Sequence, residues 1–247
     1  MESIYRKKYT VHVNDIDFKS QLKLSSLFVY LQDMATEHAY NIGLGRDALL
    51  TKYGIIWVLN RAVVEIIRHP VFKEEITIET WPEQPDKVLF NRNFLVYDKD
   101  GNIIIKAFSQ WVVIDCETRK LRRSSILEES FPKVDRERPV SSVLNKIKPV
   151  GQLDLSYKKT VGYSDIDINE HLNNARYIDY IMDCFSMDLH KKYNARSIQI
   201  DYLHEALPGE VIQLYTDMSG IKDNFVYIEG INENTKATIF KAVLTLS

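Results

Sequence analysis

Hydrophobic and polar positions follow a helical spacing in two stretches of this chain. The first stretch covers residues 25–42 and is followed by Gly43, a natural helix stop. Its apolar face carries Phe28, Leu31, Ala35, His38 and Ile42. The apolar face of the second stretch, residues 174–192, carries Ile178, Ile181, Met182, Phe185 and Leu189. Each stretch therefore predicts a helix with one buried stripe.

Runs rich in β-branched and aromatic residues follow each predicted helix. They predict strands at 55–67, 74–81, 88–97 and 103–115, and again at 196–203, 210–218, 224–231 and 236–246. Turn-forming residues separate the last two strands of each set, at 98–102 and at 232–234. A short strand and a loop come before each helix. One helix followed by several antiparallel strands predicts an α+β fold in which a curved sheet wraps around a central helix, twice.

The chain also carries two divergent copies of one sequence module, 150 residues apart. The copies, residues 10–33 and 160–183, share Thr10/Thr160, Val11/Val161, Asp15/Asp165, Ile16/Ile166, Asp17/Asp167, Leu22/Leu172, Tyr30/Tyr180 and Asp33/Asp183. Within this frame, Lys19 and Gln21 stand where the second copy has Asn169 and His171. Only the second copy offers a neutral amide together with a titratable imidazole. This asymmetry predicts a single active site, in the C-terminal copy.

The repeat divides the 247 residues into two modules of ordinary domain size. We expect an N-terminal module at 1–135, a connector at 136–152 and a C-terminal module at 153–247. The wider segment 117–158 is rich in charges and prolines and has few long apolar runs. We therefore expect that segment to cross the surface rather than to enter a core.

Charge and cysteine content narrow the class of protein. A net charge of −2 argues against a nucleic-acid binder with a large basic face. The N-terminus has no signal-peptide pattern and no stretch approaches the roughly 18 apolar residues of a membrane span, so we expect a cytoplasmic protein without a membrane partner. Cys116 and Cys184 are expected to be free thiols. The histidine spacing suits no metal, and no cofactor is expected.

Four spaced motifs point to a known family. They are S-D-I-D-I-N-E-H-L-N-N-A-R-Y at 164–177, W-V-L-N-R-A-V-V-E-I-I-R-H-P at 57–70, I-E-T-W at 78–81 and Y-L-H-E-A at 202–206. Together they resemble the acyl-ACP thioesterases of plants and bacteria, over nearly the whole chain. The resemblance implies a tandem, double-hotdog fold, which agrees with the architecture predicted above. It also implies a partner, acyl carrier protein carrying a fatty acyl chain.

The resemblance further implies the catalytic residues. The D-x-N-x-H pattern and strand glutamate of the family correspond to Asp167, Asn169, His171 and Glu205. Thioester hydrolysis mainly needs an oriented water and donors aimed at the developing oxyanion. Glu205 and His171 suit the proton transfer, and the sequence leaves open which of them is the base. Asn169 supplies an amide donor, and backbone N–H groups at the helix start near Asn174 offer oxyanion support.

Each of these assignments has an alternative. Asn169 and His171 could be a turn-forming amide and a surface imidazole. Asp167 matches Asp17 in the copy without the site, so it could simply tie a turn to backbone amides. Glu205 aligns with His69, and a solvated carboxylate at a strand end is the plain alternative. Ala206 stands where plant members commonly carry a cysteine, so direct attack by water is expected rather than a cysteine nucleophile.

The sequence therefore predicts an enzyme that hydrolyses acyl-acyl carrier protein to free fatty acid and carrier protein. We expect the N-terminal module to hold the acyl chain, and Trp57, Trp81 and Trp111 either line that channel or pack in the core. An acyl-CoA thioesterase of the same fold is one alternative. A non-catalytic module that binds or senses acyl thioesters is the other, because fold alone does not fix function. A homodimer is compatible with the sequence.

Overall fold

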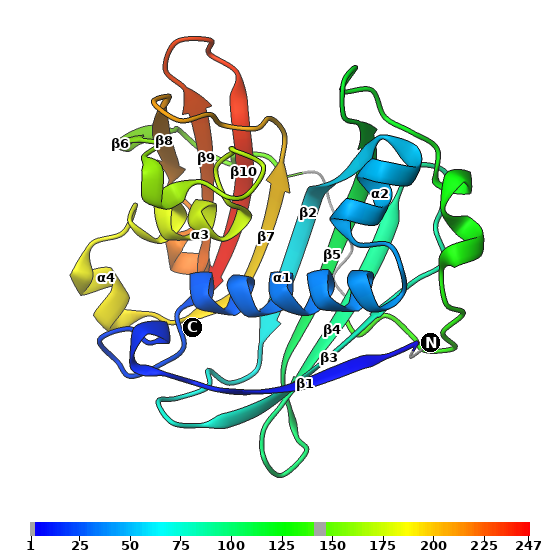
Figure 1. The fold of residues 1–247 in the computed structure, drawn as a ribbon. Helices are drawn as coiled ribbons and strands as arrows, with labels where there is room; N and C mark the ends of the chain where they lie inside the picture. The colour runs from blue at the N-terminus through cyan, green and yellow to red at the C-terminus, as the bar shows by residue number, and fades with distance from the viewer. Residues whose placement is uncertain (1–2, 141–146) are drawn as a thin grey trace. The chain divides into compact units, whose positions relative to one another are not determined.

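Each half of the chain folds into an antiparallel sheet with helices set against it (Figure 1). The computed structural model describes residues 3–140 and 147–247. The chain divides into unit 1, Met1–Ser141, and unit 2, Ser142–Ser247.

In unit 1 a five-stranded sheet is paired in the order β1-β3-β4-β5-β2. Its elements are β1 (Tyr5–Thr10), α1 (Leu24–Asn41), α2 (Arg46–Tyr53), β2 (Ile55–Ile66), β3 (Glu75–Pro82), β4 (Phe90–Tyr97) and β5 (Ile103–Asp115). The long helix α1 contacts β1 and β3 and buries the predicted stripe. Gly43, at φ +77°, follows the end of α1 as predicted.

Unit 2 repeats this arrangement, with its sheet paired in the equivalent order β6-β8-β9-β10-β7. Its elements are β6 (Asp154–Thr160), α3 (Asn174–Met182), α4 (Met187–Lys192), β7 (Ala195–Tyr202), β8 (Val211–Asp217), β9 (Phe225–Asn232) and β10 (Thr238–Leu246). The α+β prediction of one helical layer and one curved sheet in each half is confirmed.

The single helix predicted over 174–192 is wrong, because the chain leaves the helix after Met182 and starts a new one at Met187. The hydroxyl of Ser186 accepts a hydrogen bond from the N–H of Leu189 at 3.3 Å and caps the new helix. The apolar spacing runs through the break, so Phe185 and Leu189 are still partly buried.

The segment after β5 was expected to stay outside the core, and this is wrong for part of it. Leu127 and Phe131 are buried in a cluster with Phe90, and the ring centroids of Phe90 and Phe131 lie 5.3 Å apart. Trp57 and Trp111 pack against the same cluster. Leu127 and Phe131 thus attach this part of the charged segment to the core of unit 1. The end of the segment forms β6.

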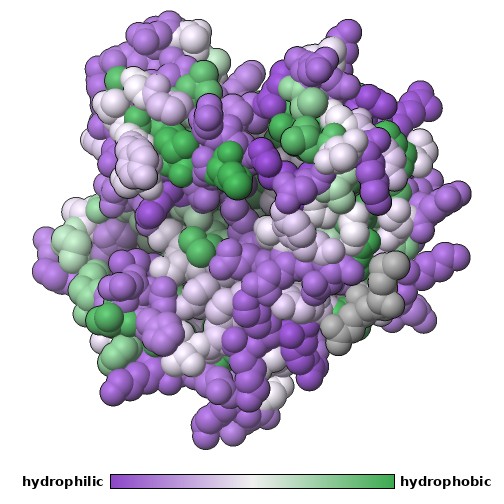
Figure 2. All heavy atoms as spheres, in the orientation of Figure 1, coloured by the Kyte–Doolittle hydropathy of each residue, from purple (hydrophilic) through white to green (hydrophobic). Residues whose placement is uncertain are grey.

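Most of the surface face in Figure 2 is hydrophilic, with hydrophobic residues in small separate groups. Both cysteines are free thiols, as predicted. Within the described residues, no helix is both long and apolar enough to cross a membrane. Among the residues that the structure describes, no group of three or more histidine, cysteine, aspartate or glutamate side chains could hold a metal ion.

Asp217, at the end of β8, fastens the segment that leads into β6. Its buried carboxylate accepts hydrogen bonds from the N–H groups of Val150, Gly151 and Ser219 and from the Ser219 hydroxyl. Burial alone would raise the pKa of this carboxyl, but these hydrogen bonds outweigh it and bring the pKa to about 2.

The Asp217→Asn variant is expected to lower the free energy of unfolding by about 1–2 kcal/mol at pH 7. The folded-state pKa lies below the unfolded value of about 3.9, so this stability is present above about pH 4 and is lost as the pH falls toward about 2. Urea unfolding at neutral and acidic pH measures the difference. Asp223→Asn, at an exposed position, is the control. An equal effect of the two variants would contradict the role of Asp217.

Candidate functional site

A tight turn in front of α3 presents two of the predicted site residues. The N–H of Asp167 donates to the carbonyl of His171 at 2.9 Å, and the N–H of Glu170 donates back to the Asp167 carbonyl at 3.0 Å. The Asp167 carboxylate accepts a hydrogen bond from the N–H of Asn169 at 2.8 Å. Glu170 takes a left-handed backbone, at φ +62°. The turn therefore holds Asn169 and His171 immediately before the helix.

Unit 1 contains the same turn without the site. There the N–H of Asp17 donates to the carbonyl of Gln21 at 2.8 Å, and the Asp17 carboxylate accepts from the N–H of Lys19 at 2.8 Å. Ser20 takes the left-handed position, at φ +60°. Because Asp17 and Asp167 make the same contacts, Asp167 has a structural role in unit 2. A direct part for Asp167 in a reaction remains a proposal.

The structure brings His171 and Glu205 together. Nε2 of His171 lies 3.5 Å from Oε2 of Glu205, and the two side chains are 23% and 36% exposed. The backbone sets this approach, because the N–H of Leu172 donates to the carbonyl of Ala206 at 2.9 Å. An imidazole and a carboxylate in contact, both open to solvent, can orient a water molecule and exchange its proton.

The equivalent backbone bond in unit 1 runs from the N–H of Leu22 to the carbonyl of Pro70, at 2.8 Å. It places Gln21 and His69 where unit 2 has His171 and Glu205. The sequence alignment of His69 with Glu205 follows the same correspondence. Unit 1 thus keeps the scaffold of the pair and lacks its carboxylate.

The start of α3 lies next to this pair in the chain. Asn173 caps the helix by accepting the N–H of Ala175 on its side-chain oxygen, at 2.9 Å. Asn174 is the first helical residue. The first turn of a helix presents N–H groups without intrahelical acceptors at its positive dipole end, which suits a developing oxyanion.

Cys184 is not placed as a nucleophile at this site. Ala206 follows Glu205 and is fully buried. Cys184 lies beyond the other end of α3, where its Sγ contacts the carbonyl oxygen of Tyr180 at 3.4 Å. Burial, with a smaller contribution from Asp183, raises the pKa of the Cys184 thiol to about 12. Such a thiol carries almost no thiolate near neutral pH.

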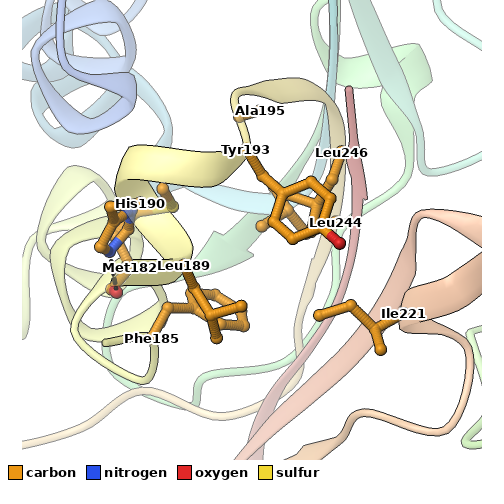
Figure 3. Close-up of a pocket in the computed structure, with 9 residues that line it drawn as sticks. All are labelled: Met182, Phe185, Leu189, His190, Tyr193, Ala195, Ile221, Leu244 and Leu246. Atoms are coloured by element: carbon orange, nitrogen blue, oxygen red, sulfur yellow. Dashed lines mark hydrogen bonds between the residues drawn. The ribbon is translucent and has the colours of Figure 1, made fainter. Parts of the chain in front are cut away.

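A separate apolar pocket of about 300 Å³, including space open to solvent, lies between α4 and the ends of β7 and β10 (Figure 3). Phe185, Leu189, Tyr193 and Leu244 are among its lining residues. None of the predicted site residues lines it, so it does not belong to the candidate site.

Sequence reasoning missed two residues packed beneath the site, Tyr177 of α3 and Tyr202 of β7. Their rings meet edge to face, with centroids 5.3 Å apart. Both lie inside the motifs at 164–177 and 202–206. The signal that could have found them is the comparison of the copies, which have Leu27 and Ile66 at these positions in unit 1.

Comparison with known proteins places both units in one family. The model of the acyl-ACP thioesterase N-terminal domain matches residues 2–131, and that of the C-terminal domain matches residues 152–245.

Curated relatives include two plant proteins. The chain is 23% identical to oleoyl-acyl carrier protein thioesterase 2, chloroplastic, of Arabidopsis thaliana, over 95% of this chain and 68% of that protein. It is 25% identical to the oleoyl-acyl carrier protein thioesterase, chloroplastic, of Coriandrum sativum, over 90% and 64%. The chain thus spans about two thirds of the length of these relatives.

Solved structures agree with the fold. A crystal structure of an acyl-ACP thioesterase from Bacteroides thetaiotaomicron is 27% identical, has a TM-score of 0.89, and is matched over 99% of this chain and 98% of that one. A 12:0-ACP thioesterase from Umbellularia californica is 18% identical, with a TM-score of 0.87 over 100% and 98%, and supports the fold alone. The predicted double-hotdog fold is confirmed.

Proposed function

The chain belongs to the acyl-ACP thioesterase family, whose members are thioester hydrolases, and we propose that it hydrolyses fatty acyl-acyl carrier protein by attack of water. The products are a free fatty acid and the carrier protein. The observation that carries this proposal is the contact between Nε2 of His171 and Oε2 of Glu205, 3.5 Å apart. Unit 1 has an equivalent turn but has Gln21 and His69 at these two positions.

In the proposed reaction the His171–Glu205 pair holds a water molecule and takes one proton from it as its oxygen attacks the thioester carbonyl carbon. The carbonyl oxygen becomes an oxyanion, which the amide of Asn169 and the N–H groups at the start of α3, near Asn174, stabilise. The intermediate then collapses, the carbon–sulfur bond breaks, and the pair returns the proton to the leaving thiolate. Asp167 supports these steps by holding the turn.

We also propose a division of labour between the two units. Unit 1 lacks the His171–Glu205 pair but keeps the helix and sheet, and we assign it the acyl chain. The matched ranges, 2–131 and 152–245, support module boundaries at 1–135 and 153–247 with a connector at 136–152. We propose a cytoplasmic location, although the plant relatives are named chloroplastic.

The decisive experiment offers the purified protein the same acyl chains on acyl carrier protein and on CoA, at several chain lengths. We expect kcat/KM to be at least about 10-fold higher for the carrier-protein substrates, because a protein partner adds contacts that CoA cannot make. Equal or higher values with acyl-CoA would favour an acyl-CoA thioesterase. Tight binding of acyl thioesters without release of fatty acid would favour a sensor.

A further inference from the structure

Three aromatic side chains form a cluster beneath the candidate site, in which Tyr177 and Phe240 are buried and Tyr202 is half-buried. The ring centroid of Tyr177 lies 5.3 Å from that of Tyr202 and 5.6 Å from that of Phe240, with interplanar angles of 88° and 85°. Tyr177 comes from α3, Tyr202 ends β7 and Phe240 belongs to β10. The cluster therefore joins the catalytic helix to the strand that leads to Glu205.

The two tyrosine hydroxyls bind backbone groups on opposite sides of the site. Oη of Tyr202 donates to the carbonyl oxygen of Asn174, the first residue of α3, at 3.1 Å. Burial raises the pKa of Tyr177, and a hydrogen bond with the backbone of Ala206 lowers it. Ala206 directly follows Glu205.

Unit 1 has aliphatic residues at the three positions that are equivalent to the aromatic cluster. When the two copies are aligned, Leu27 of α1 occupies the position equivalent to Tyr177 of α3. The backbone bonds Leu22–Pro70 and Leu172–Ala206 align the strands of the two units. In that alignment Ile66 of β2 is equivalent to Tyr202 of β7. Ile66 pairs with Ile105 as Tyr202 pairs with Phe240. All three unit 1 residues are buried. Aliphatic side chains therefore fill this layer where there is no His/Glu pair, and the hydroxyls occur only beneath the pair.

We propose that Tyr177 and Tyr202 are positioning residues, whose hydroxyls hold the Glu205 loop and the start of α3 at the separation the reaction needs. This inference rests on the proposed function. The tyrosines touch no reacting atom and act through Glu205 and through the N–H groups of the helix start. Displacements of about 1 Å can lower a rate about 10²-fold, so two hydrogen bonds that fix both sides of the site affect turnover strongly.

The test replaces each hydroxyl without removing the ring, by Tyr177→Phe and Tyr202→Phe. We expect kcat to fall about 10-fold to 100-fold while KM stays within about 2-fold and the melting temperature changes little. Tyr157→Phe is the matched control, because Oη of Tyr157 also donates to a carbonyl of α3, that of Tyr180, at 2.7 Å. Tyr180 lies toward the other end of the helix, so this variant is expected to keep kcat within about 2-fold.

A double-mutant cycle separates positioning from general stabilisation. If Tyr177 acts through Glu205, Tyr177→Phe has little further effect on the residual kcat of the Glu205→Gln variant. The full loss in both backgrounds would overturn the inference, as would equal kcat values for all three tyrosine variants of an active enzyme. A wild-type protein that hydrolyses no acyl thioester would instead refute the proposed function, and with it the role of the tyrosines.

Discussion

Replacing His171 by alanine is expected to lower kcat/KM for acyl-acyl carrier protein by at least about 10²-fold to 10³-fold. In the proposed mechanism the imidazole shares the proton of the attacking water with Glu205, and alanine cannot take over this proton transfer. Asn169→Ala, which removes the proposed amide donor to the oxyanion, is expected to lower kcat by about 10²-fold or more. Fatty acid release at saturating and limiting substrate measures both losses, and circular dichroism verifies the fold.

Unit 1 provides the control for these variants. Gln21→Ala and Lys19→Ala alter the equivalent positions of a turn with the same backbone hydrogen bonds. We expect both to keep kcat/KM within about 2-fold, because that turn lacks the His/Glu pair. If His171→Ala and Asn169→Ala lost activity because the turn was damaged, these variants would be less stable than the wild-type protein. The matching unit 1 variants would then show a similar loss of stability. Equal losses of activity in both copies would contradict a single site.

The fold was predictable because the hydrophobic pattern is strong where the elements are long. The runs at 55–67 and 103–115 predict β2 and β5 within one residue, since β-branched and aromatic residues fill both. The stripe from Phe28 to Ile42 fixes α1 in the same way, with Gly43 as its end.

The two wrong predictions have a common cause, because each depends on a few side chains. The break between α3 and α4 depends on the helix cap at Ser186. The apolar spacing of a helix extends over many residues and does not detect a single capping residue. Leu127 and Phe131 join a core although their neighbours are charged, and only the three-dimensional contacts show which apolar residues find partners.

The site was predictable in its members and less so in its geometry. Comparison of the copies singled out Asn169 and His171, whereas Glu205 came from the family resemblance. The 3.5 Å contact between His171 and Glu205 depends on a backbone bond between Leu172 and Ala206, far apart in the sequence. The shared turn also shows why Asp167 alone is no sign of catalysis, since Asp17 makes the same contacts.

Glu205→Gln is expected to reduce kcat by about 10²-fold to 10⁴-fold, because it keeps the shape of the side chain and removes the negative charge that accepts or orients the proton of water. KM is expected to change little, since the substitution leaves the surfaces that bind the substrate intact. Single-turnover release of fatty acid from acyl-acyl carrier protein measures the chemical step directly.

The contrast with the thiols decides between water and a covalent intermediate. Cys184→Ser and Cys116→Ser are expected to keep kcat within about 2-fold, because the Cys184 thiol has a pKa of about 12 and Ala206 occupies the position after Glu205. Alkylating reagents are expected to inhibit the wild-type enzyme slowly, and larger reagents are expected to inhibit it more than smaller ones. Rapid stoichiometric inactivation that disappears in Cys184→Ser would establish a thiol nucleophile and remove Glu205 from the role of activating water.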